Sequence, residues 1–130
     1  MQFLIKSDKI IKINNIKISF DFPIKTILDF DDCLVILLIP QEKDDIKQVE
    51  KNNKTNLLAI NNKGQILWQI SNIYIPEIRK VVHKTPLIIL DETLKKEISN
   101  KFDLLIHLDK FNFYFNPKTG EKIREEQIEK

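Results

Sequence analysis

The chain is short of several residue types that carry structure or chemistry. Its 130 residues include two glycines, one cysteine, one tryptophan and two arginines. The single cysteine, Cys33, excludes an internal disulfide and is typical of a reducing compartment. The longest apolar run, residues 33–39, is far too short for a membrane-spanning helix, and the first residues lack the apolar stretch of a signal peptide. We therefore expect a cytoplasmic protein with no membrane segment.

The charge is nearly balanced, because the formal net charge is only +2 at pH 7. Lysine outnumbers arginine 19 to 2, and isoleucine and asparagine are also abundant. All three abundant residues have A/T-rich codons, so the lysine excess is not interpreted as a functional signal. Nucleic-acid binders usually carry a strong excess of basic residues, so this charge balance argues against nucleic-acid binding.

The two glycines occupy equivalent places in two similar segments. Gly64 lies in residues 57–68, Leu-Leu-Ala-Ile-Asn-Asn-Lys-Gly-Gln-Ile-Leu-Trp, and Gly120 lies in residues 113–123, Phe-Tyr-Phe-Asn-Pro-Lys-Thr-Gly-Glu-Lys-Ile. Glycine used this sparingly indicates backbone positions with φ above zero, which other residues adopt only at a cost. Both segments are therefore predicted to be β-hairpins.

A third hairpin is predicted over residues 10–20. A two-residue turn at Asn14–Asn15 would place all of its isoleucines on one face and set Lys12 opposite Lys17 on the other. Opposed lysines repel each other slightly, which indicates a solvated face.

The rest of the chain also favours antiparallel strands. Residues 24–30 and 33–39 form a hairpin that turns at Asp31–Asp32, and the second of these strands is apolar throughout, as expected at the centre of a fold. A short helix is predicted over residues 91–100, and a strand meander over residues 102–124.

The predicted fold is a single domain over residues 1–130 of mainly β class. We expect an antiparallel, hairpin-rich curved sheet or partly open barrel, with one or two short helices. Residues 40–55 form a polar loop excursion, and residues 125–130 form a charged tail that frays. Edge strands rich in isoleucine make a homodimer possible.

Two resemblances to known proteins accompany this pattern. Residues 58–68, Leu-Ala-Ile-Asn-Asn-Lys-Gly-Gln-Ile-Leu-Trp, resemble a blade hairpin of quinoprotein-type β-propellers, although 130 residues are too few for a propeller. The order of an Asn-turn hairpin, an Asp-rich turn, a Gly-x-x-x-Trp hairpin and a closing Pro-x-Thr-Gly strand is similar to short uncharacterised bacterial all-β proteins. The second resemblance implies that some relatives are immunity proteins of toxin systems, and it supplies no functional residue.

Catalytic and metal-binding patterns are weak. His83, His107 and Cys33 are too far apart in sequence for a metal-ligand motif, and Cys33 begins an apolar run where a thiol is inert packing. Asp29, Asp31 and Asp32 lack the pattern of a calcium loop and are typical of turns. We therefore expect no enzyme, no cofactor and no metal, with an enzyme of unrecognised type as an alternative function.

An aromatic and basic segment offers one alternative function. Phe111, Phe113 and Phe115 alternate onto one face, and basic residues flank them. Exposed rings of this kind bind single-stranded nucleic acid by stacking on its bases. The core face of a strand explains the same alternation and is favoured here.

An acidic region gives the main functional hypothesis. Residues 29–50 contain seven acidic residues and two lysines. If Asp31 and Asp32 lie on the same rim as Asp44 and Asp45, they form an acidic patch on a mildly basic body. Such a patch predicts a protein-binding module, in its sharpest version an immunity protein that neutralises a basic toxin such as a nuclease. A merely solvated loop is the alternative interpretation.

Overall fold

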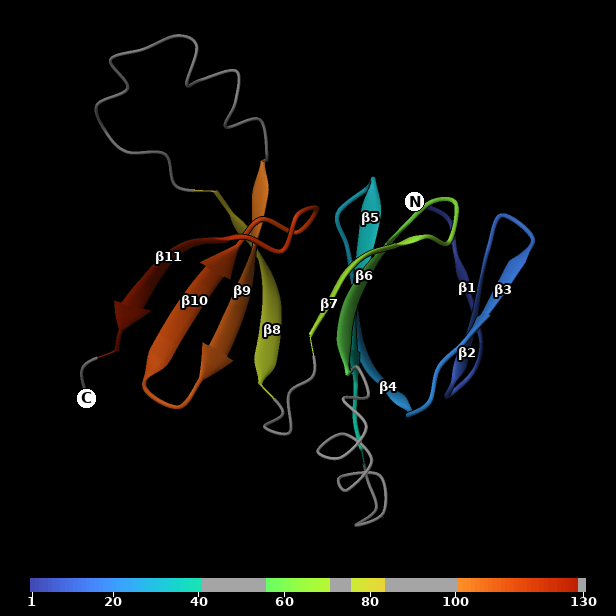
Figure 1. The fold of residues 1–130 in the computed structure, drawn as a ribbon, viewed down its shortest axis with the longest axis horizontal. Coiled ribbons are helices and arrows are strands. Elements are labelled where there is room, and N and C mark those ends of the chain that lie inside the picture. The colour runs from blue at the N-terminus through green and yellow to red at the C-terminus, as the bar shows by residue number, and fades with distance from the viewer. Residues whose placement is uncertain (41–55, 71–75, 84–100, 129–130) are drawn as a thin grey trace, which may run out of the picture.

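Eleven strands in three antiparallel sheets make up the described part of the chain (Figure 1). The computed structural model describes residues 1–40, 56–70, 76–83 and 101–128. The predicted mainly β, antiparallel, hairpin-rich class is confirmed, although the strands form separate sheets that are not closed into a barrel. No helix occurs in these four ranges, so none there could span a membrane, and the helix expected over residues 91–100 lies outside them.

The first sheet consists of β1 (Leu4–Ser7), β2 (Ile10–Ile13) and β3 (Ile16–Ser19) in sequence order. The predicted register of β2 and β3 is confirmed, with each lysine opposite its expected partner. Asn14 and Asn15 have φ values of 47° and 68°, as a two-residue type I′ turn requires. Asparagine tolerates this left-handed conformation better than most residues, so the turn needs no glycine.

The central sheet contains β4 (Ile24–Asp29), β5 (Cys33–Leu38), β6 (Leu57–Asn61) and β7 (Ile66–Ile70), again in sequence order. Every residue of β5 is buried, which confirms the prediction that this strand lies at the centre of the fold. Gly64, with a φ of 76°, ends the turn between β6 and β7.

The third sheet has the order β11-β10-β9-β8. Its strands are β8 (Glu77–Val82), β9 (Phe102–Leu108), β10 (Phe111–Phe115) and β11 (Lys122–Gln127). The sequence alone leaves residues 73–84 ambiguous, because Pro76 within them and Pro86 just beyond them break any long element. The tail predicted to fray from residue 125 instead continues β11 as far as residue 127.

The central sheet lies between the other two sheets and buries both of its faces (Figure 1). Alternate residues of β5 and β6 point in opposite directions, as the period of a strand requires. One face packs against the first sheet through Ile11, Ile13, Leu34, Ile36, Leu38, Leu58 and Ile60. The other face packs against the third sheet through Cys33, Val35, Leu37, Leu57, Ala59, Ile78, Leu104 and Ile106. The sequence of a strand that is buried on both faces therefore has apolar residues at successive positions, with no polar residues alternating between them.

Two side chains join the central sheet to the third sheet. The indole N–H of Trp68 donates a hydrogen bond to the carbonyl of Pro117, at 2.7 Å. Lys80 of β8 places its ammonium 4.2 Å from the ring centroid of Phe102 and donates to the backbone carbonyl of Asp29, at 2.9 Å. The first contact joins β7 to the turn between β10 and β11, and the second joins β8 to the end of β4.

Candidate functional site

The acidic turn consists of Asp31 and Asp32, which connect β4 to β5. Both residues are exposed, although the strand that follows them is wholly buried. Asp31 has a φ of 72°, and its N–H donates to the side chain of Asp29 at 2.8 Å, which stabilises the turn. The other two predicted partner-binding residues, Asp44 and Asp45, lie outside the described residues.

Neighbouring cations neutralise part of this turn. Asp32 forms an ion pair with Lys118 at 2.5 Å, and the amino group of Met1 lies 3.4 Å from Asp29. Asp31 has no ion pair within the four described ranges. It is therefore the carboxylate of the turn with most charge left to attract a partner, while Asp32 would have to exchange Lys118 for one.

A pocket of about 260 Å³ opens beside the acidic turn. Phe30, Phe102 and Pro117 supply its apolar lining, and Asp31, Asp32, Lys101 and Lys118 supply its charged lining. An apolar floor with a charged rim is the arrangement that holds an inserted side chain of a protein partner. Sequence reasoning missed this pocket, because the pocket combines turns about 85 residues apart.

The outer face of the third sheet carries both arginines of the chain. Strand pairing aligns Arg79 of β8 and Arg124 of β11 in one row, with Leu105 and Tyr114 between them. The guanidinium carbon of Arg124 lies 3.8 Å from the centroid of the Tyr114 ring. Arginine and tyrosine are enriched at protein interfaces, so this row is a second candidate surface.

A hydrogen-bond network orders the adjacent row of the same face. Glu126 accepts from the side-chain amide of Asn112 at 3.1 Å, so the oxygen of that amide faces His107 Nδ1 at 2.8 Å. Because the Glu126 carboxylate can only accept hydrogen bonds, the Asn112 amide presents its oxygen, also an acceptor, to His107. His107 Nδ1 therefore carries the proton of this hydrogen bond, and Nε2 keeps its lone pair when the ring is neutral. Glu126 also accepts from the Tyr114 hydroxyl at 2.7 Å, and this hydrogen bond raises the pKa of Tyr114.

A buried pair of ionisable residues escaped sequence reasoning. His83 Nδ1 lies 2.8 and 2.9 Å from the two carboxylate oxygens of Asp103, whose side chain is 1% exposed. His83 Nε2 is also buried and finds no hydrogen-bond partner in the described ranges. The two residues are 20 positions apart and meet only because β8 pairs with β9, so no spacing motif marks them. The described residues contain no group of three or more potential metal ligands of these types.

The aromatic residues of β10 belong mainly to the core. Phe113 and Phe115 pack against the buried cluster between the central and third sheets. Phe111 is 37% exposed and stacks on Phe113, with ring centroids 5.9 Å apart. The favoured core interpretation is therefore confirmed for two of the three rings, and these two are not available to stack on bases.

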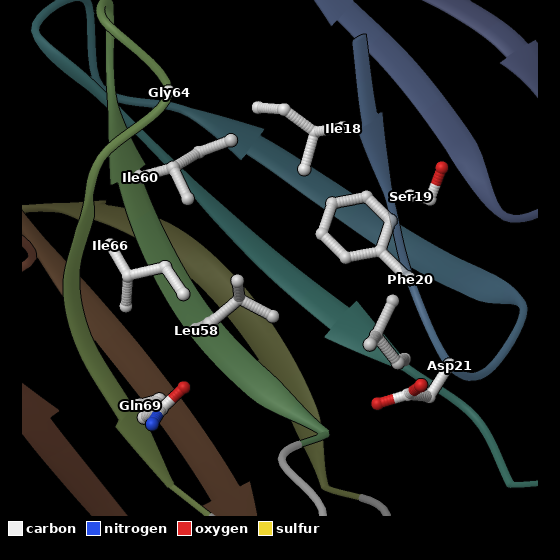
Figure 2. Close-up of a pocket in the computed structure, with 10 residues that line it drawn as sticks. Ile18, Ser19, Phe20, Asp21, Leu58, Ile60, Gly64, Ile66 and Gln69 are labelled. Carbon is white, nitrogen blue, oxygen red and sulfur yellow. The ribbon is translucent and has the colours of Figure 1, made fainter.

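A groove of about 300 Å³ separates β3 from the edge strand β7. Figure 2 shows Ile18 and Phe20 on one side of this groove, with Ile60 and Ile66 on the other. Of the polar lining residues, Gln69 lies on the same side of the groove as Ile66, and Asp21 lies on the side of Phe20. Its lining suits an apolar group, and neither aspartate of the acidic turn contributes to it.

Cys33 lies in the core, where its thiol packs against other side chains and is expected to be unreactive. Its side chain is fully buried, and burial together with the negative charge of Asp32 raises the pKa of the thiol to about 11. We predict that Cys33 reacts with a thiol reagent at pH 8 at least tenfold more slowly in the folded protein than in urea, because the thiolate is the reactive species. Absorbance at 412 nm with Ellman's reagent measures this, and equal rates in the two states would contradict it.

Comparison with known proteins identifies a family. Residues 1–89 match the family model described as Domain of unknown function (DUF7957), so the chain belongs to this family. The matched range ends beyond β8, and β9 to β11 follow it. No curated protein and no solved structure matches the chain. The likeness to uncharacterised proteins agrees with this result, whereas the likeness to immunity proteins stays a prediction.

Proposed function

We propose that this member of the DUF7957 family is a protein-binding module that docks a basic partner on the acidic turn. The observation that carries this proposal is the exposure of Asp31 and Asp32 at the tip of a hairpin anchored by a wholly buried strand. A rigid turn loses little conformational entropy on binding, so its carboxylates contribute most of their attraction to affinity. The pocket beside the turn supplies the apolar contact that charges alone lack.

The sharpest version of this function is an immunity protein that neutralises a basic toxin. A nuclease active site is built to hold phosphates, and a surface that presents carboxylates competes for the same positive groups. Asp44 and Asp45 extend the same acidic region in sequence. Opposite charges on the two proteins would also accelerate association, and the rate would fall as salt is added.

Neutralising the turn tests this proposal. We expect the Asp31→Asn, Asp32→Asn variant to lose a basic partner that the tagged wild-type protein captures from its own cells. With the purified partner, we expect at least a tenfold weaker Kd at low salt, because the two substitutions keep the shape of the turn and remove its charge. Mass spectrometry identifies the partner, and calorimetry measures the Kd.

Asp109 provides a matched control. This residue is also exposed in a turn and also has a positive φ, of 56°. Asp109→Asn should leave the Kd within twofold of the wild-type value. Equal affinity of all three proteins would refute docking on the acidic turn, and a captured partner without excess positive charge would refute the toxin version.

A further inference from the structure

Three lysines gather in one pocket on the outer face of the first sheet. Lys6, Lys12 and Lys17 come from β1, β2 and β3, and they line a shallow pocket of about 480 Å³. Ser7, Ile10 and Asn15 complete its lining. No carboxylate lines the pocket, and none of the three lysines has an ion pair in the part of the chain that the structure describes.

The placement of these lysines is unfavourable for the protein alone. Lys12 and Lys17 are directly opposite each other in the β2–β3 ladder. Like charges at directly opposed positions destabilise a sheet, and here no neighbouring acid in the pocket offsets the repulsion. A bound anion would remove this repulsion as well as form its own contacts, so it would stabilise the folded state.

We propose that this pocket binds the phosphate groups of a small polyphosphorylated ligand. Ammonium groups are strong point-charge donors to phosphate, and the three side chains are long enough to converge on one group from adjacent strands. Ser7 Oγ accepts a hydrogen bond from the N–H of Lys9 at 3.3 Å, which leaves its hydroxyl proton free to donate. Asn15 adds an amide donor.

The extent of the pocket distinguishes a small ligand from a nucleic-acid strand. A strand needs a continuous basic path with exposed aromatic rings for its bases. Here the three lysines are confined to one pocket without aromatic lining, and the exposed Leu4 lies opposite Lys12 in the register. This site shares no residue with the acidic turn, so it does not depend on the proposed protein-binding function.

Titration with tripolyphosphate at low salt tests the site. We expect saturable changes in the amide NMR signals of residues 6–17. The Lys12→Gln, Lys17→Gln variant should bind at least tenfold more weakly, because it removes two of the three cationic donors. The matched control is Lys63→Gln, Lys110→Gln, which changes the net charge equally at two exposed turn positions and should bind like the wild-type protein.

A second variant separates loss of binding from loss of folding. Lys17→Glu creates an opposed Lys–Glu pair, so we expect it to unfold at a higher temperature than the wild-type protein and yet to lose tripolyphosphate binding. Three results would overturn the proposal: no saturable change, equal weakening by both double variants, or tighter binding of a single-stranded oligonucleotide than of tripolyphosphate.

Discussion

Replacing Gly120 by alanine is expected to destabilise the protein by about 2–4 kcal/mol, since a left-handed alanine and an overpacked contact each cost about 1–2 kcal/mol or more. Gly120 has a φ of 73°, and a Cβ built there would lie 2.8 Å from Cγ of Trp68. The indole ring has little freedom to move away, because its N–H donates to Pro117. Urea unfolding followed by circular dichroism measures the change in the free energy of unfolding.

Substitution of Gly64 separates the two causes of the stability loss expected for Gly120→Ala, which are the left-handed backbone and the contact with Trp68. The φ of Gly64, 76°, is nearly the same, but an added Cβ would lie no closer than 3.3 Å to its neighbours, which are side-chain atoms of Ile16 and Ile18. We therefore expect Gly64→Ala to cost only about 1–2 kcal/mol, mainly for the backbone conformation. In a Trp68→Leu background, Gly120→Ala should cost no more than Gly64→Ala. An undiminished cost in that background would show that contact with the indole ring is not the cause.

The hairpins could be predicted because the residues that determine each turn and each register lie close together in the sequence. Asn14–Asn15, Asp31 and Gly64 all adopt positive φ, and each belongs to a residue type that tolerates this conformation. The alternation of isoleucine and lysine then specified the register of β2 and β3, since a slip by one residue would expose the apolar face. The unbroken apolar run of β5 likewise indicated burial on both faces.

The stacking of sheets and the candidate sites were less accessible to sequence reasoning. Local patterns indicate that a strand has an apolar face, but not which other sheet covers that face. The pocket beside Asp31 needs the turn that contains Pro117, and the row from Arg79 to Arg124 needs four strands in one order. Each combination depends on tertiary pairing between distant segments. The unassigned strand β8 belongs to the same problem, because it becomes recognisable only through its pairing with β9.

Removing the carboxylate of Asp103 is expected to cost about 1–3 kcal/mol, the range for leaving a buried hydrogen-bonding group without its partner. Asp103→Ala would leave Nδ1 of His83 without its acceptor in a site where the His83 side chain is only 10% exposed. The reciprocal change, His83→Ala, leaves a 1% exposed carboxylate without that donor and should cost a similar amount. Urea unfolding of both variants measures these costs.

The double variant determines whether the two residues act as a pair. Once either partner is lost, removing the other also removes an unsatisfied buried group, so the double variant should cost less than the sum of the single variants by more than 1 kcal/mol. His107→Ala is a suitable control, because this histidine bonds to the Asn112 amide on the outer face rather than to a buried carboxylate. Its cost should stay near 1 kcal/mol, the usual contribution of one such bond. Additive costs for His83 and Asp103 would mean that each residue contributes through other contacts, and the junction of β8 and β9 would then not depend on their pairing.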